Sequence, residues 1–287
     1  MRSKDAQKIL DALVARIRLP PEDEALRQPK SIADARAILL RDTVYLFPQA
    51  AAYAHGLNNT DGRMLEATME LVMGESQLVA SQVLSIQEAW ISNDLRIARA
   101  NIATTRGTAM TDRARILQQL VLAVEDGNTI AAALAQVAPA HITRGAELAR
   151  VLRTEAPTDA RTWALTAEYH RLRGEWTEFD AAMREAEQRS TEPSRALRYL
   201  RAMEQLERHR KPVVSAKLLR EALVEFPNFV RAQAALVVTA QRPRQALREL
   251  AHLKRMNAEH YLVMLLEPAL AAEQELLHQN GVDDAQQ

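Results

Sequence analysis

Apolar residues recur every three or four positions along most of the chain, with polar residues between them. This spacing places the apolar side chains on one face of a helix, so it predicts amphipathic α-helices and not strands. A first helix is expected at 3–18, where two prolines at 20–21 end it. Ser31 is expected to cap a second helix, which runs to Phe47 and is stopped by Pro48.

The longest continuous pattern predicts a helix at 63–90, in which Gly74 is either tolerated or introduces a bend. The run Ser-Asn-Asp at 92–94 is typical of a new helix start, and a further helix is expected at 112–124, closed by Glu-Asp-Gly at 125–127. We therefore expect separate helices in this part of the chain. They would form either a bundle or an irregular start to a solenoid.

After residue 127, helices of about twelve residues alternate with short turns. Such pairs of short helices indicate internal repeats. A gapless self-match supports this, because residues 37–48 and 216–227 both read Ala, then Leu-Leu-Arg, an acid and a closing Phe-Pro. The expected repeat units are 34, 36 and 34 residues apart and start near Asp126, Ala160, Ala196 and Val230.

In one unit the residues follow the order aromatic, small, turn glycine, large apolar and small: Trp163, Ala167, Gly174, Met183 and Ala186. In the next unit the corresponding places are held by Tyr199, Leu219, Ala222 and Pro227, of which the last two are a closing Ala and Pro, and in the unit before Gly145, Ala149 and Pro157 fit. On these residues and the period, the chain resembles the tetratricopeptide repeat (TPR) family over residues 126–258. Thr166 and His170 depart from the family's pattern, which leaves another α-solenoid of similar shape open.

The expected fold is therefore all-α: an α-α superhelix of TPR-like helical hairpins, with an N-terminal helical segment and a C-terminal capping helix. Five parts are expected. They are an N-terminal helix and Pro-rich linker at 1–30, a helical region of bundle or irregular repeats at 31–125, the TPR-like repeats at 126–258, the capping helix at 259–279 and a polar tail at 280–287.

Composition narrows the function classes. The 287 residues include 37 Lys plus Arg against 37 Asp plus Glu, so no basic surface for direct nucleic-acid binding is expected. Without cysteine, disulfides and thiolate metal sites are excluded. No apolar run is long enough to span a membrane, and no signal peptide is evident, so the cytoplasm is the expected compartment.

Motifs for catalysis are sparse. The eight glycines are scattered, so no phosphate-binding loop is expected, and the seven histidines lack metal-ligand spacing. We expect no enzyme activity, no cofactor and no metal. Arg255 and His260 match the loose Arg-x4-His pattern of HEPN ribonucleases, which makes a helical ribonuclease or other enzyme the third hypothesis.

Stacked helical hairpins curve, and the first helix of each pair lines the concave face that such proteins use for binding. The expected register puts charged residues there beside apolar ones, among them Val238. The predicted peptide-binding residues are Arg161, Glu168, Arg171, Glu204, Arg208, Arg231 and Arg242. These charges indicate a peptide or protein partner with acidic side chains or a free carboxylate, bound by a scaffold, adaptor or co-chaperone. The alternative is a regulatory or sensor module of a signalling or transcription complex.

Overall fold

The structure is a computed structural model that describes residues 3–14, 25–102, 109–241 and 243–267. In this part of the chain the regular elements are all helices, as the sequence predicts. The N-terminal helices are α1 (Ser3–Val14), η1 (Ala25–Arg27), α3 (Ile32–Leu40), η2 (Val44–Leu46) and α4 (Phe47–Gly56). Two long helices follow, α5 (Thr60–Ile102) and α6 (Ala109–Glu155). Shorter ones complete the series: α7 (Ala160–Arg173), α8 (Trp176–Arg189), α9 (Arg195–Glu207), α10 (Pro212–Glu225), α11 (Val230–Thr239) and α12 (Pro243–Met256).

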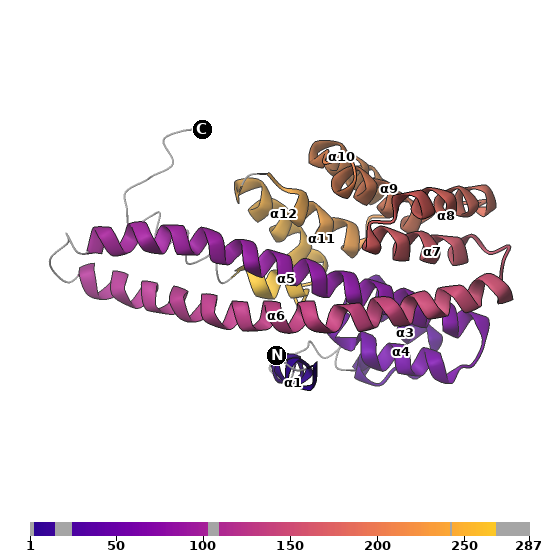
Figure 1. The fold of residues 1–287 in the computed structure, drawn as a ribbon, viewed down its shortest axis with the longest axis horizontal. Coiled ribbons are helices and arrows are strands. Elements are labelled where there is room, and N and C mark those ends of the chain that lie inside the picture. The colour runs from indigo at the N-terminus through magenta and orange to yellow at the C-terminus, as the bar shows by residue number, and fades with distance from the viewer. Residues whose placement is uncertain (1–2, 15–24, 103–108, 242, 268–287) are drawn as a thin grey trace.

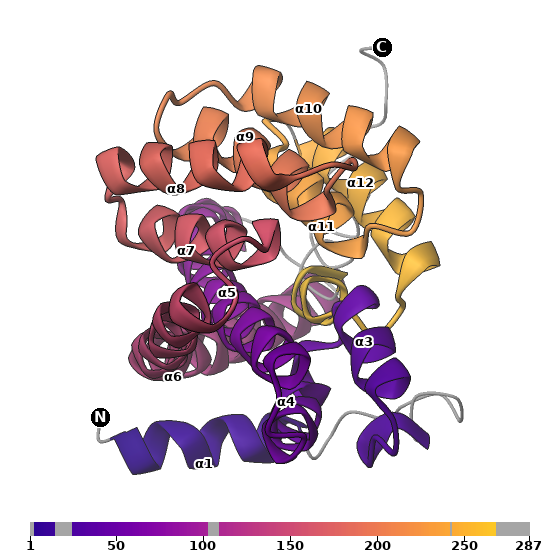
Figure 2. The same cartoon turned by 90° about the vertical axis from the view of Figure 1, so that its right-hand side faces the viewer.

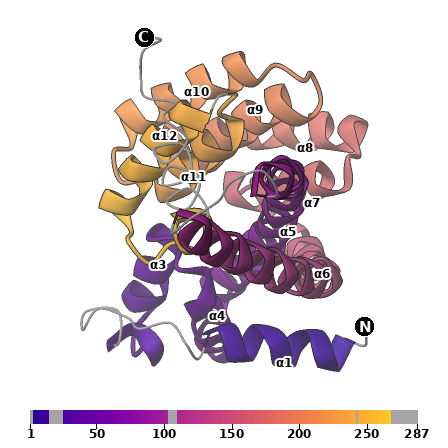
Figure 3. The same ribbon diagram turned by 90° about the vertical axis from the view of Figure 1, so that its left-hand side faces the viewer.

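Helices α5 and α6 form an antiparallel hairpin that runs along the longest axis of the molecule (Figure 1). Helices α7 to α12 lie on one side of this hairpin, while α1, α3 and α4 lie on the other (Figures 2 and 3). The end of α5 and the beginning of α6 extend beyond the other helices (Figure 1). Among the described residues, no helix has an apolar stretch that would allow it to cross a membrane.

The two long helices differ from the shorter ones predicted for this region. Helix α5 continues through the expected start at 92–94, and α6 continues through the expected break at 125–127. The helices can stay continuous because they pack closely against each other. A Cβ on Gly74 would lie 2.6 Å from Ile142 Cγ1, and one on Gly145 would lie 2.6 Å from Leu71 Cγ. The glycines therefore serve as sites of close helix approach, and neither one ends its helix.

The first helical hairpin also departs from the prediction. Ser31 caps α3 as expected, in a capping box with Asp34, but α3 ends at Leu40. Asp42 then takes a left-handed backbone conformation with φ of 52°, and Pro48 lies in the first turn of α4. Pro48 therefore starts a helix where the sequence predicts that it stops one.

Helices α7 to α12 form three consecutive pairs, α7–α8, α9–α10 and α11–α12, with contacts between neighbours along the chain. They begin where the sequence predicts the units after residue 159. Asp159 caps α7, and Gly174 ends it with φ of 70°, which matches its predicted place in a turn. The predicted helix at 259–279 is present at 261–267, and the rest of it lies outside the described residues.

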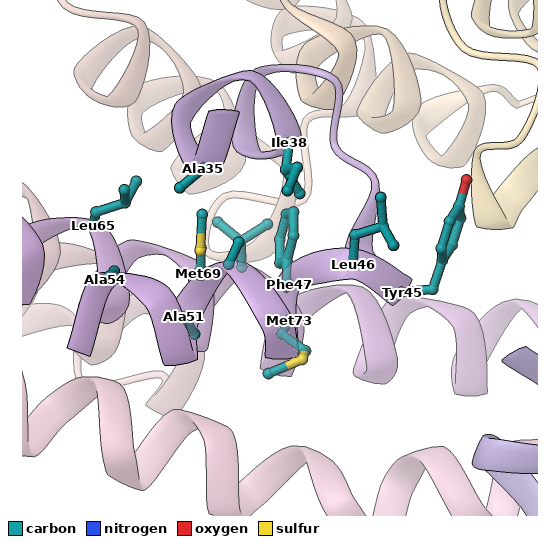
Figure 4. Close-up of a cluster of buried hydrophobic side chains, with 12 residues drawn as sticks. Ala35, Ile38, Tyr45, Leu46, Phe47, Ala51, Ala54, Leu65, Met69 and Met73 are labelled. Atoms are coloured by element: carbon teal, nitrogen blue, oxygen red, sulfur yellow. The ribbon is translucent and has the colours of Figure 1, made fainter. Parts of the chain in front are cut away.

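Several clusters of buried apolar side chains connect these layers. One lies between α3, α4 and α5, where Ile38, Phe47 and Met69 meet (Figure 4). Another joins α11 and α12 to the 261–267 helix and to Val79 of α5. Helix α5 therefore contacts the N-terminal helices on one side and the helix pairs on another.

Candidate functional site

The predicted binding residues of α7 and α11 converge on α5. Glu168 and Arg171 come from α7, and Arg231 comes from α11. All three bond inside the protein, and the Arg171 residue is 3% exposed. Their common partner is Glu75 of α5, which is 5% exposed. The face that the sequence assigns to a peptide is, at this point, in contact with a helix of the same chain.

The contacts form a continuous charge network. Arg171 donates to Glu75, to Glu168 at 2.8 Å and to Glu207 at 2.5 Å. Arg231 donates to the same two carboxylates, Glu75 and Glu168, the latter at 2.5 Å. Two guanidinium groups are thus bridged by two shared carboxylates, with a third carboxylate at the edge. Charge-assisted bonds of this kind are stronger than neutral ones, and removal of one partner leaves a buried charge unpaired.

Tyr199 of α9 lies inside this network. Its hydroxyl group donates to Glu75 at 2.9 Å. The guanidinium carbon of Arg231 is 4.1 Å from the centre of its ring, and that of Arg171 is 5.7 Å away. The ring is therefore attracted by both cations. Through Tyr199, the network includes all three helices α7, α9 and α11.

The network favours the ionised state of Glu75, Arg171 and Arg231. Burial alone would raise the pKa of the Glu75 carboxyl, but the guanidinium groups of Arg171 and Arg231 lower it to about 2. Burial opposes the charge on both arginines, yet the neighbouring carboxylates raise the pKa of each well above its usual value. Burial raises the pKa of Glu207, which lies at the edge. Glu75 and the two arginines thus form a fixed charged group and not a proton donor or acceptor.

Glu204 and Arg208 lie in a separate group further along α9. Glu204 accepts hydrogen bonds from Arg201 at 2.9 Å and from Arg208 at 3.3 Å. Arg208 also donates to Asp180 of α8 at 2.9 Å. This group, in which Glu204 is buried and both Arg208 and Asp180 are partly exposed, joins the first helix pair to the second.

The remaining two predicted residues are elsewhere. Arg161 is exposed at the start of α7, where it donates to Asp159 at 2.7 Å and to Asp61 of α5 at 3.4 Å. Arg242 lies outside the described residues. The predicted set is therefore divided between the buried network, the Glu204 group and the start of α7.

Arg255 and His260, which matched the ribonuclease pattern, lie in different surroundings. Arg255 is exposed on α12, whereas the His260 ring is fully buried. The His260 Nδ1 atom accepts the N–H of Leu262 at 3.2 Å, so the ring proton is on Nε2, which donates to Asp42 Oδ2 at 3.0 Å. His260 therefore holds the turn after α3 against the turn after α12.

A small open pocket, with about 30 Å³ of room for water-sized molecules, lies beside the buried network. Helices α5, α9, α11 and 261–267 form its walls, together with the turn that carries Asp42. It shares Glu75, Tyr199 and Arg231 with the network. The other lining residues are Asp42, Ser76, Val79, Met203, Leu206, Ala234, Ala235, Val238, Tyr261 and Leu262. The pocket thus combines apolar walls with a few buried polar groups, as ligand sites commonly do.

Sequence reasoning missed Glu75, although the sequence carries a signal for it. Glu75 lies four residues after Leu71 and four before Val79, which places an acid in line with the apolar positions of the predicted helix. An acid in that position needs a buried partner of opposite charge. The sequence gives no comparable signal for Asp42, because the group that faces it is 218 residues away.

In the described part of the chain, no three acidic or histidine side chains are placed to hold a metal ion. The fold and the site define a class: an all-α protein of sequential helix pairs, packed on a long helical hairpin through a buried charge network. Comparison with protein-family models, curated proteins and solved structures finds no match to this chain.

Proposed function

We propose that the chain is a non-enzymatic protein-interaction module whose helix pairs α7–α12 form a TPR-like superhelix. Helices α7, α9 and α11 begin at Ala160, Arg195 and Val230, so successive pairs are 35 residues apart, close to the family's period of 34. Ala167 and Ala186 are buried where the family places small residues. Arrays of this kind bind partners along the face lined by the first helix of each pair.

Within that face, the pocket is the proposed place of contact. Arg171 and Arg231 already bind Glu75 and Glu168, so their guanidinium groups are not available to bind an acidic partner. The surface beside them is open, and Val238 on its edge is 40% exposed. An exposed apolar side chain beside buried polar groups is typical of a site that takes a side chain from a partner.

The observation that carries this proposal is the pocket between α9 and α11, the first helices of two successive pairs. A peptide or protein segment seated there would contact two pairs and α5 at once. No cofactor is required. A regulatory module in a signalling or transcription complex would use the same surface, and only the identity of the partner would differ.

Photo-crosslinking in the native host tests the proposal. A photoreactive amino acid is placed at Val238, and in a matched control at Val224, which is 84% exposed on α10 and does not line the pocket. We expect a discrete crosslinked protein from position 238 that is absent from position 224. The same adducts at both positions, or none at position 238, would contradict the assignment of the pocket.

A further inference from the structure

In the described part of the chain, the exposed large apolar side chains are concentrated on α10. Three of these five residues, Val213, Val214 and Val224, lie on this helix. The opposite face of α10 packs on α9 and α11. In all three views α10 lies at the edge of the molecule furthest from α1 (Figures 1 to 3). The exposed face of α10 is therefore placed to meet another molecule.

Four exposed residues form a stripe along this face. They are Val214, Lys217, Glu221 and Val224, and their spacing of three, four and three residues places them on one side of the helix. The stripe lies opposite Leu219, which is fully buried. Val214 and Val224 are five residues before and after Leu219, and the two charged residues are two before and two after it. The stripe is thus symmetric about the middle of the helix.

The two charges of the stripe are available to bond outside the chain. Arg220 and Glu225, the other charged residues of α10, are bonded to α12 and α9. Lys217 and Glu221 are 77% and 57% exposed and, among the described residues, pair only with each other at 3.9 Å. A pair this exposed contributes little to stability, and a lysine that precedes its acid is the less favourable order on a helix.

A second copy of α10 complements the stripe. When two identical helices pair antiparallel about a two-fold axis, each residue faces the one that lies equally far beyond the midpoint in the partner. With the midpoint at Leu219, Val214 faces the partner's Val224, and Lys217 faces the partner's Glu221. Symmetry repeats each contact, which gives two apolar contacts and two ion pairs. A parallel arrangement would place each lysine against its own copy, which is repulsive.

We propose that this stripe is a homodimer contact, in which two copies of the chain pair antiparallel through α10. One helix from each copy buries less than the roughly 1,200 Å² of a stable interface, so a dissociation constant on the order of 100 μM is expected. No residue of α10 lines the pocket, so the proposal is independent of the partner site. Any photo-crosslinked adduct at position 224 is then two copies of this chain, distinct from the partner adduct at position 238.

Sedimentation velocity of the full-length protein at rising concentration tests the dimer. Lys217→Glu and Glu221→Lys each create two like-charge contacts, so each variant alone should associate about tenfold or more weakly. Mixed in equal amounts, the two variants should recover the dimer as a heterodimer, because each acid then meets a lysine. Lys254→Glu, which makes the same change in charge at an exposed ion pair of α12, should associate as the wild type does.

The absence of cysteine allows the antiparallel register to be tested by disulfide formation. Val214→Cys and Val224→Cys are oxidised separately and as a mixture. We expect a linked dimer from the mixture and none from either variant alone, since each position lies about 15 Å along the helix from its own copy. Equal linkage in all three samples, or equal association of the charge variants and the wild type, would overturn the proposal. A chain that stays monomeric at every concentration would also overturn it and assign the stripe to a different protein.

Discussion

Two sides of helix α5 meet the rest of the molecule through different interactions. Toward α6, Gly74 approaches Ile142 and Gly145 approaches Leu71, at distances that leave no room for a methyl group. Toward α7, α9 and α11, the next residue, Glu75, presents a buried charge to two arginines. At the contact with α6, a substitution that adds side-chain volume should destabilise the protein. At the Glu75 contacts, a substitution that removes a charge should do so. Each side should therefore respond to a different kind of substitution.

The largest change in stability is expected from substitutions in the charge network around Glu75. Arg171→Leu leaves Glu75 and Glu168 with one cation in place of two and keeps an apolar side chain of moderate size. We expect the free energy of unfolding, measured by urea denaturation, to fall by about 3–5 kcal/mol. A decrease below about 1 kcal/mol, as for an exposed ion pair, would show that the network is not buried in solution.

The ionisation of Glu75 should give the next largest change in stability, as the pH is varied. The folded protein lowers the Glu75 pKa from 4.5 to about 2, so its ionised form stabilises the fold above the unfolded pKa, and this stabilisation is lost as the pH falls toward 2. Compared with Glu75→Gln, the wild type should therefore lose on the order of 3 kcal/mol more stability between about pH 5 and pH 2. Parallel pH profiles of the two proteins would contradict the lowered pKa.

A smaller change in stability is expected at the close contact between α5 and α6. Gly74→Ala introduces a Cβ 2.6 Å from Ile142 Cγ1 and 3.2 Å from the carbonyl oxygen of Ala138. We expect destabilisation of about 1–3 kcal/mol, in spite of the higher helix propensity of alanine. Gly56→Ala is the matched control, because no atom lies within 4 Å of its added Cβ. Equal effects of the two substitutions on the thermal midpoint would show that the helices are not in close contact.

The smallest effect is expected from Arg161, which is on α7 as Arg171 is. Its side chain is 58% exposed in its ion pairs with Asp159 and Asp61. Arg161→Ala should change the free energy of unfolding by about 0–1 kcal/mol. A loss of stability as large as that of Arg171→Leu would mean that the difference in exposure does not determine how much each arginine contributes to stability. The sequence assigned both arginines to one surface.

The helix pairs were the part of the fold that the sequence predicted best. Local signals determine their limits, such as the Asp159 cap and the left-handed Gly174, and both act within a few residues. The long helices were predicted as shorter ones because the signals at 92–94 and 125–127 are local too, and the structure overrides them. For α5 and α6, the contact of Gly74 and Gly145 with the opposite helix depends on residues some seventy positions away.

The self-match of 37–48 with 216–227 shows the same limit. In the second segment, α10 stays helical to Glu225, whereas in the first α3 ends at Leu40. The turn at Asp42 is held by His260, and Asn257 donates to the carbonyl oxygen of Arg41 at 2.7 Å. Similar local patterns thus take different structures, because distant residues hold the turn that ends the first helix early.

For the site, Glu168 and Arg171 lie on α7 and Arg231 lies on α11, the first helices of the first and third pairs. The sequence did not reveal that Glu75 pairs with the two arginines, because sequence spacing predicts which residues share a helix face and not which helix covers that face. Arg171→Glu would therefore change folding as well as binding. Substitutions at the exposed Val238 separate the two.

A double-mutant cycle between Glu75 and Arg231 tests most directly that α5 is held to the helix pairs by this network. The free energies of unfolding are measured for the wild type, Glu75→Gln, Arg231→Gln and the double variant at neutral pH. We predict a coupling energy of about 2 kcal/mol or more, because each single substitution removes one of the two oppositely charged partners of the other group. Additive effects, within about 0.5 kcal/mol, would contradict the account.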